Sequence, residues 1–226
     1  MLASGARHAV EERKTQIIAL VVVIALIGGA GLGYYLWRDH VQGNAHALLA
    51  DALAVDDAPV GPAANPDAPE KGLRFPTARA KSQAALTKFK IVADTYPATD
   101  AGIVARYREA ATWMALASPA QAATSYQQVI DQAGDAVYGQ MARLGLAEAQ
   151  AESGHFDQAI STFKQLAEKK DGTLPVDGIL MQLGRTYLSA GKPTDAQQAF
   201  DRLTQEFPDS PFSAEAKQAL DNLKKS

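Results

Sequence analysis

The chain has 226 residues, of which 47% are hydrophobic and 21% charged, and its formal net charge is −3 at pH 7. This composition is typical of a folded protein, and the slight acidity provides no basic surface for nucleic acid. The chain contains no cysteine. That absence excludes disulfides, cysteine-ligated metals, a thiol nucleophile and a lipid-acylated cysteine.

The first distinctive segment is apolar. Residues 17–37 (IIALVVVIALIGGAGLGYYLW) include no charged residue in 21 positions. As a helix this segment would be roughly 31 Å long, close to the thickness of the hydrocarbon core of a bilayer. Tyr34, Tyr35 and Trp37 lie at its C-terminal end, as is typical of a membrane interface. The segment therefore predicts a single transmembrane helix in the lipid bilayer.

A cleaved signal peptide is the alternative, because Gly28 and Ala30 have the small-residue spacing of a cleavage site. The apolar stretch continues beyond Ala30, which favours an uncleaved anchor. Residues 1–16 contain three Lys or Arg residues, whereas the fifteen residues after the segment contain only Arg38. The positive-inside rule then predicts a cytoplasmic tail and a periplasmic or extracytoplasmic C-terminal domain, with the chain in the bacterial inner membrane.

Three further regions follow the predicted anchor. Residues 38–55 are predicted to form a juxtamembrane helix, since leucines recur on one side of it. Residues 56–76 contain five of the eleven prolines and are predicted to be a loop or linker, because proline lacks a backbone donor and disfavours helix before it. Residues 77–226 contain only helix-like patterns of ten to twenty residues.

These helix-like patterns repeat every 37 residues. An aromatic residue recurs with this period, and an alanine precedes each aromatic by four positions. A small alanine allows two helices to approach closely, while the aromatic fills the space beside them. The aligned positions are Ala85, Ala122, Ala159 and Ala196, followed by Phe89, Tyr126, Phe163 and Phe200.

The repeated unit resembles the tetratricopeptide repeat, a helix–turn–helix unit, here lengthened by three residues. The resemblance implies an all-α, TPR-like solenoid over residues 77–226, ending in a C-terminal capping helix. The first copy lacks its own first helix, and the juxtamembrane helix can take that position. The second copy lacks the turn glycine. The last copy fits best, through Leu183, Gly184, Tyr187, Gly191, Ala196, Phe200 and Pro208.

The chain as a whole resembles the YfgM-like family of bacterial inner-membrane proteins. The resemblance lies in the single N-terminal anchor, the segment GYYLWRDHVQGNAHALLADAL and the repeats. Members of that family are ancillary to the Sec translocon and accompany periplasmic chaperones. The ending FPDSPFSAEAKQAL is also similar to cell-division coordinators and outer-membrane assembly lipoproteins of the envelope. The missing cysteine and the retained anchor speak against the lipoprotein.

No catalytic constellation accompanies these repeats. The four histidines include no pair at i, i+4 and no carboxylate partner at ligand spacing, and no serine stands in a nucleophile-elbow context. The sequence therefore predicts a non-enzyme with no catalytic, cofactor-binding or metal site.

In a tetratricopeptide superhelix, the first helix of each unit lines the concave face. Carried over to this chain, the resemblance implies a mostly apolar groove for a protein segment, with Arg185 as a carboxylate anchor. The alternative is that the terminal or juxtamembrane helix of the same chain fills this groove. The predicted partner-binding residues are Val104, Tyr107, Met114, Met141, Leu144, Met181, Arg185 and Leu188.

Three functions are compatible with these features. The leading hypothesis is a membrane-tethered interaction scaffold that binds translocon subunits, a periplasmic chaperone or unfolded clients. The alternatives are an envelope-assembly or cell-division coordinating factor and a homo-oligomerisation module. Resemblance in fold does not identify the partner.

Overall fold

The structure is a computed structural model that describes residues 2–62, 72–169 and 173–225. The side chains of residues 2–17, 19 and 21 are outside this description. The chain divides into two compact units, Met1–Asn44 and Ala45–Ser226. Secondary structure in the described residues consists of α-helices and one isolated β-bridge. The helices are α1 (Leu2–Asp56), α2 (Ala78–Thr95), α3 (Asp100–Ala115), α4 (Pro119–Ala133), α5 (Val137–Glu152), α6 (Phe156–Glu168), α7 (Val176–Ser189), α8 (Pro193–Glu206) and α9 (Ser213–Leu223).

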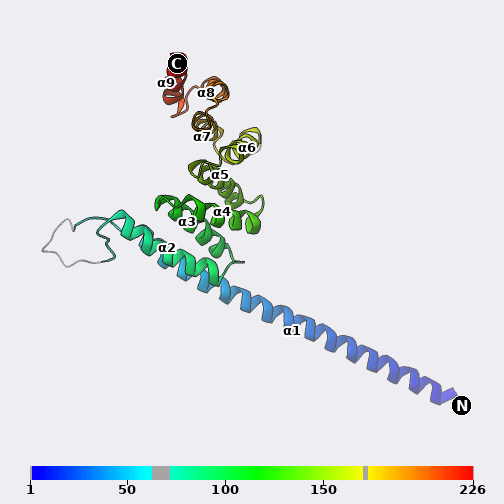
Figure 1. The fold of residues 1–226 in the computed structure, drawn as a ribbon. Coiled ribbons are helices and arrows are strands. Elements are labelled where there is room, and N and C mark those ends of the chain that lie inside the picture. The colour runs from blue at the N-terminus through cyan, green and yellow to red at the C-terminus, as the bar shows by residue number, and fades with distance from the viewer. Residues whose placement is uncertain (1, 63–71, 170–172, 226) are drawn as a thin grey trace. The chain divides into compact units, whose positions relative to one another are not determined.

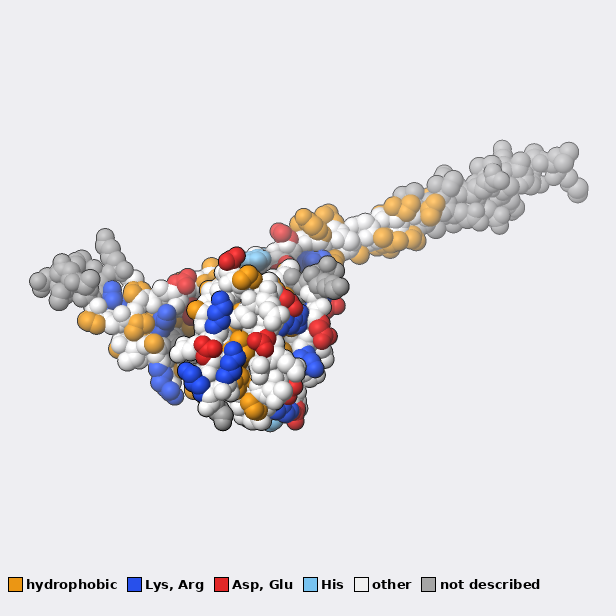
Figure 2. Space-filling view, turned by 90° about the horizontal axis from the view of Figure 1, so that it is seen from above, with side chains coloured by type: hydrophobic (Ala, Val, Ile, Leu, Met, Phe, Trp, Pro, Cys, Tyr) orange, Lys and Arg blue, Asp and Glu red, His pale blue; other side chains and the backbone are white. Residues whose placement is uncertain are grey.

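Helix α1 joins two segments that the sequence analysis treated separately, residues 17–37 and residues 38–55. No proline or turn signal separates them, so the helical hydrogen bonds continue from one to the other. Hydrophobic side chains gather along the described part of α1 (Figure 2), and its large ones between Ile18 and Trp37 are 49 to 67% exposed. In the part of the chain with described side chains, no helix is long and apolar enough to cross a membrane. Part of the predicted span, at residues 17, 19 and 21, lies outside that part.

The unit Ala45–Ser226 is a stack of helix hairpins (Figure 1). Each helix from α2 to α9 packs against the next one in the chain, and α3 also contacts α5 as α5 contacts α7. The four repeated alanines are all 0% exposed, and the four repeated aromatics are at most 4% exposed. These eight side chains belong to three hydrophobic clusters along the stack. The prediction of an all-α, TPR-like solenoid is therefore confirmed.

The C-terminal end of α1 contributes to the first of these clusters. Ala45, Leu49, Ala52 and Val55 are buried there together with Phe89 of α2. The chain then leaves α1 and enters the region predicted as a Pro-rich loop, in which residues 63–71 lie outside the described residues. At the base of this region Val60 and Phe75 form a β-bridge, and the Arg74 guanidinium donates to the carbonyl of Pro62 at 3.1 Å. The two ends of the region are thus held side by side.

The three hairpin turns within the repeats share one backbone conformation. Gly154 and Gly191 have φ angles of 78° and 70°, and Ala117, one period earlier, has a φ of 56°. After α3, the amide of Ser118 donates to the carbonyl of Trp113 at 2.9 Å, the six-to-one bond of a Schellman motif. This copy has Ala117 where the later copies have the turn glycine. The fold nevertheless imposes the left-handed conformation on an alanine.

We expect Ala117→Gly to raise the free energy of unfolding by about 1 kcal/mol. An L-residue in the left-handed region costs roughly 1–2 kcal/mol, and the greater freedom of glycine in the unfolded chain offsets part of that gain. Urea unfolding followed by circular dichroism measures the change. Ala115→Gly, inside the last turn of α3, is the matched control and should destabilise; stabilisation by both variants would contradict the role of the φ angle.

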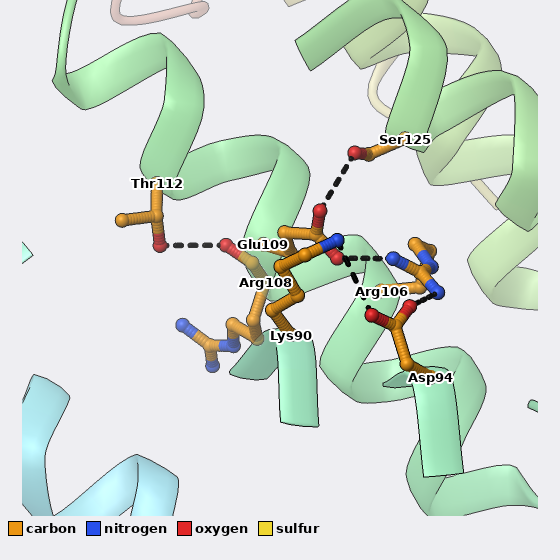
Figure 3. A network of polar contacts seen from close by, with 7 residues as sticks. All are labelled: Lys90, Asp94, Arg106, Arg108, Glu109, Thr112 and Ser125. Atoms are coloured by element: carbon orange, nitrogen blue, oxygen red, sulfur yellow. Dashed lines mark hydrogen bonds and ion pairs between the residues drawn. The ribbon is translucent and has the colours of Figure 1, made fainter. Parts of the chain in front are cut away.

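A buried polar network joins α2, α3 and α4 (Figure 3). The Arg106 guanidinium, on a residue that is 7% exposed, donates to Glu109 and to Asp94, each at 2.5 Å. The Ser125 hydroxyl of α4 donates to the other Glu109 oxygen at 3.2 Å. Arg106 also holds the pKa of Asp94 below its ordinary value. The charges inside this junction are therefore paired.

Candidate functional site

The first helices of three successive hairpins, α3, α5 and α7, carry the residues predicted to bind a partner. Five of these residues are half-buried, so that part of each side chain faces solvent, and Leu188 on α7 is 40% exposed. An apolar side chain in this position contacts its own fold and still offers surface to another molecule. The five half-buried residues are Val104, Tyr107, Met114, Met141 and Leu144.

Met181 does not belong to such a surface. It is 1% exposed and lies in the C-terminal hydrophobic cluster together with its neighbours Ile179 and Leu180, which are also 1% exposed. Three consecutive buried residues point in three directions around a helix. The start of α7 is therefore enclosed by other helices on several sides, which removes Met181 from the predicted groove.

Arg185, the predicted carboxylate anchor, already binds a carboxylate of its own chain. Its Nη2 and Nε atoms donate to Glu215 of α9 at 2.5 and 3.2 Å. Arg185 is 46% exposed and Glu215 is 51% exposed, so this ion pair adds little stability. The ion pair nevertheless neutralises the only cation that was predicted on this face. Glu215 lies on α9, the terminal helix that was the predicted alternative occupant of the groove.

Tyr107, one of the predicted partner-binding residues, lies beside two other tyrosines. The ring of Tyr107 lies 5.7 Å from that of Tyr126 and 5.6 Å from that of Tyr138, measured between centroids. Burial raises the pKa of Tyr107, and the charge of Glu148 raises it further. Tyr138 is not among the predicted partner-binding residues, although its position at the start of α5 is a signal that could identify it.

A pocket of ≈ 290 Å³ lies between α5, α6 and α7. It coincides with the predicted face at Arg185 and adds two carboxylates, Glu148 and Glu152, one helical turn apart. A volume of this size is at the lower limit of sites that hold small molecules or single side chains. The lining is completed by Ala151, Phe156, Phe163, Gln182, Thr186 and Ser189.

The surroundings of Glu148 in this pocket raise the pKa of its carboxyl group above the ordinary value. Burial raises its pKa, the Gln182 amide that donates to it at 3.4 Å partly offsets this effect, and the charge of Glu152 raises the pKa again. The folded protein therefore binds a proton at Glu148 more tightly than the unfolded chain does. As a consequence, ionised Glu148 destabilises the fold at neutral pH, and this cost is relieved as the pH falls through the raised pKa towards the ordinary value of 4.5.

We expect Glu148→Gln to raise the melting temperature at pH 7.5 by about 1–3 °C, because the neutral amide keeps the shape without the buried charge. The difference from the wild-type protein should shrink as the pH is lowered towards 4. Thermal unfolding at several pH values measures it, with Glu168→Gln, an exposed position outside this pocket, as the control that changes little. A lower melting temperature for Glu148→Gln at pH 7.5 would contradict this account.

No group of three or more His, Asp or Glu side chains that could hold a metal occurs in the ranges that the structure describes. Helix hairpins stacked in one direction, with a face formed by their first helices, define an α-solenoid of the protein-interaction class. Such repeat proteins are generally scaffolds without enzymatic activity.

The chain belongs to the family described as Tetratricopeptide repeat-like domain, whose model matches residues 12–225. The match covers α1 from residue 12 onward as well as the repeats. The lengthened 37-residue unit is thus a member of this repeat family, as the resemblance in the sequence implied.

Several solved structures share the fold at low sequence identity. The crystal structure of MamA has a TM-score of 0.53 at 17% identity and covers 64% of this chain and 78% of its own. The TPR-like repeats of a kinesin light chain from Podosopora anserina have a TM-score of 0.55 at 14% identity, with coverage of 64% and 78%. A tetratricopeptide repeat protein from Parabacteroides merdae has a TM-score of 0.52 at 14% identity, with coverage of 64% and 54%. No curated protein sequence matches the chain significantly.

Proposed function

We propose that this protein is a membrane-tethered scaffold of the bacterial envelope that binds proteins on the face formed by α3, α5 and α7. One observation carries the proposal. Along that face, six apolar or aromatic side chains predicted to bind a partner stay half-buried or exposed. Partly exposed apolar side chains on the first helices of successive hairpins are typical of a protein-binding face.

The tether is proposed from the apolar segment 17–37. Its supports are the absence of charge, the excess of basic residues before it and the aromatic residues Tyr34, Tyr35 and Trp37 at its end. Large hydrophobic side chains that are 49 to 67% exposed favour burial in another apolar medium, and a bilayer supplies one. In this proposal the N-terminus is cytoplasmic and the repeats are periplasmic.

The partners are proposed from the resemblance to the YfgM-like family. They would be subunits of the Sec translocon, together with a periplasmic chaperone or an emerging unfolded chain. The repeat fold supports protein partners in general. Envelope-assembly machinery and further copies of this chain are the other classes of partner, and the experiment below distinguishes them.

Site-specific photo-crosslinking in intact bacterial membranes tests the proposal. A photoreactive amino acid is placed at Leu188 or Met141 on the predicted face, and at exposed Gln128 of α4 or Gln198 of α8 as controls. We expect translocon or chaperone subunits to be captured from the first two positions and not from the controls. Capture of only the chain itself would support homo-oligomerisation, and capture of only cell-wall or outer-membrane machinery would support the envelope-assembly alternative.

Alkaline extraction of the same membranes tests the tether separately. The full chain should stay in the membrane pellet, and a variant that lacks residues 17–37 should be released. Release of the full chain would overturn the proposed anchor without affecting the binding face.

A further inference from the structure

The pocket between α5, α6 and α7 carries a negative charge that its surroundings do not neutralise. Glu148 accepts one long hydrogen bond, from the neutral Gln182 amide at 3.4 Å. Within the described part of the chain, neither Glu148 nor Glu152 has a Lys or Arg within ion-pair distance. Two uncompensated carboxylates on neighbouring turns of α5 therefore face the same pocket.

The single cation of the pocket cannot compensate these carboxylates in this arrangement. Arg185 donates two hydrogen bonds to Glu215 and one to the Gln182 side chain, the latter at 3.5 Å. Counted with Glu215, the charges of the pocket sum to an excess of two negative charges. The half-buried Glu148 is the more costly of the two, because a desolvated charge without a partner destabilises its surroundings.

The remaining walls fit the aliphatic part of a long cationic side chain. Ala151, Phe156 and Phe163 supply apolar surface between the carboxylates and the core. Lys and Arg side chains lay their methylene groups along such surface while the charged end reaches a carboxylate. Leu144 precedes Glu148 by one helical turn on α5, and Leu188 follows Arg185 by about one turn on α7, so each shares a side of its helix with a residue of the pocket.

We propose that this face binds an extended partner segment that is both apolar and basic, with one Lys or Arg side chain inserted between Glu148 and Glu152. The proposal rests on the proposed function, because it names the chemistry of the partner for the same face. Arg185 alone would favour an acidic group of the partner. The charge of the pocket instead favours a cation, while Arg185 stays paired with Glu215. Charge complementarity selects this occupant over an acidic one.

Binding of three fluorescein-labelled nonapeptides to the full chain in detergent micelles tests the proposal. The peptides have the sequence Gly-Ala-Leu-Ala-Xaa-Ala-Leu-Ala-Gly, in which Xaa is Lys, the uncharged analogue norleucine, or Glu. We expect the Lys peptide to bind about tenfold more tightly than the norleucine peptide, and the Glu peptide to bind most weakly. The double variant Glu148→Gln/Glu152→Gln should lose the preference for Lys and keep its affinity for norleucine.

A matched variant, Glu168→Gln/Asp209→Asn, removes two exposed carboxylates elsewhere and should retain the preference for Lys. Equal affinity for Lys and norleucine, or a preference for Lys that survives in the double Gln variant, would overturn the cation pocket and leave the binding face intact. Failure of every peptide to bind above the level of protein-free micelles would overturn the pocket together with the binding face. Fluorescence anisotropy distinguishes these outcomes.

Discussion

Replacing Phe200 by Ala is expected to lower the free energy of unfolding by about 3–5 kcal/mol, as typical for a fully buried aromatic side chain. Phe200 is 0% exposed and lies in the C-terminal cluster beside Leu203 and Ala196. Opposite its ring stands Gly184, where an added Cβ atom would lie 2.3 Å from the ring. The α7 backbone thus approaches the ring directly, and no larger side chain at that position can move in to fill the cavity.

The destabilisation caused by Phe200→Ala should at first affect only the helices near Phe200. In a repeat stack each hairpin is stabilised chiefly by its neighbours, so α7, α8 and α9 should lose protection before α2 and α3 do. Hydrogen exchange measured by mass spectrometry gives this order, and urea unfolding gives the total change. Exposed Gln197→Ala on the same helix is the control and should change stability by less than about 0.5 kcal/mol. A change of that small size for Phe200→Ala would contradict the packing described for this cluster.

The second large effect is expected at the buried network of α3. Glu109→Ala should destabilise the protein by about 3–5 kcal/mol, because it leaves the buried Arg106 guanidinium with one carboxylate fewer and the Ser125 hydroxyl without its acceptor. Glu109 is 3% exposed, so water cannot readily replace the lost oxygen atoms. Urea unfolding measures the cost.

A double variant separates the pairing of these charges from the shape of the side chains. Arg106→Met/Glu109→Leu removes both buried charges while it keeps apolar volume, and it should be much less destabilising than Glu109→Ala alone. Asp94 would then retain Lys90, which lies 3.2 Å from it near the surface. If the double variant proves as unstable as the single one, the cost comes from lost packing or from the Ser125 hydroxyl, and the explanation by an unpaired Arg106 charge is wrong.

The candidate binding face could be predicted only in part from the sequence. A helical period tells which residues share one side of a helix, and the apolar positions of α3 and α5 follow from it. It does not tell what lies opposite that side. Met181 stands one 37-residue repeat after the half-buried Leu144, yet Met181 is buried, because the neighbouring helices close over the start of α7.

The sequence by itself determined the repeat. Small alanines and large aromatics at a spacing of 37 residues can meet only in stacked helix pairs, so the helices, their order and their buried positions follow from a local pattern. It also determined the apolar, uncharged composition of residues 17–37. Both can be recognised from the order of residues along the chain and need no knowledge of contacts in space.

Only the tertiary structure decided the electrostatics. Arg185 meets Glu215 thirty residues further along the chain, and Arg106 meets Asp94 on the preceding helix. The same long-range packing leaves Glu148 half-buried without a cation and holds Ala117 in a glycine-like turn. Charge pairing and backbone strain depend on which helices become neighbours in space, and a periodic pattern within each helix carries no information about those partners.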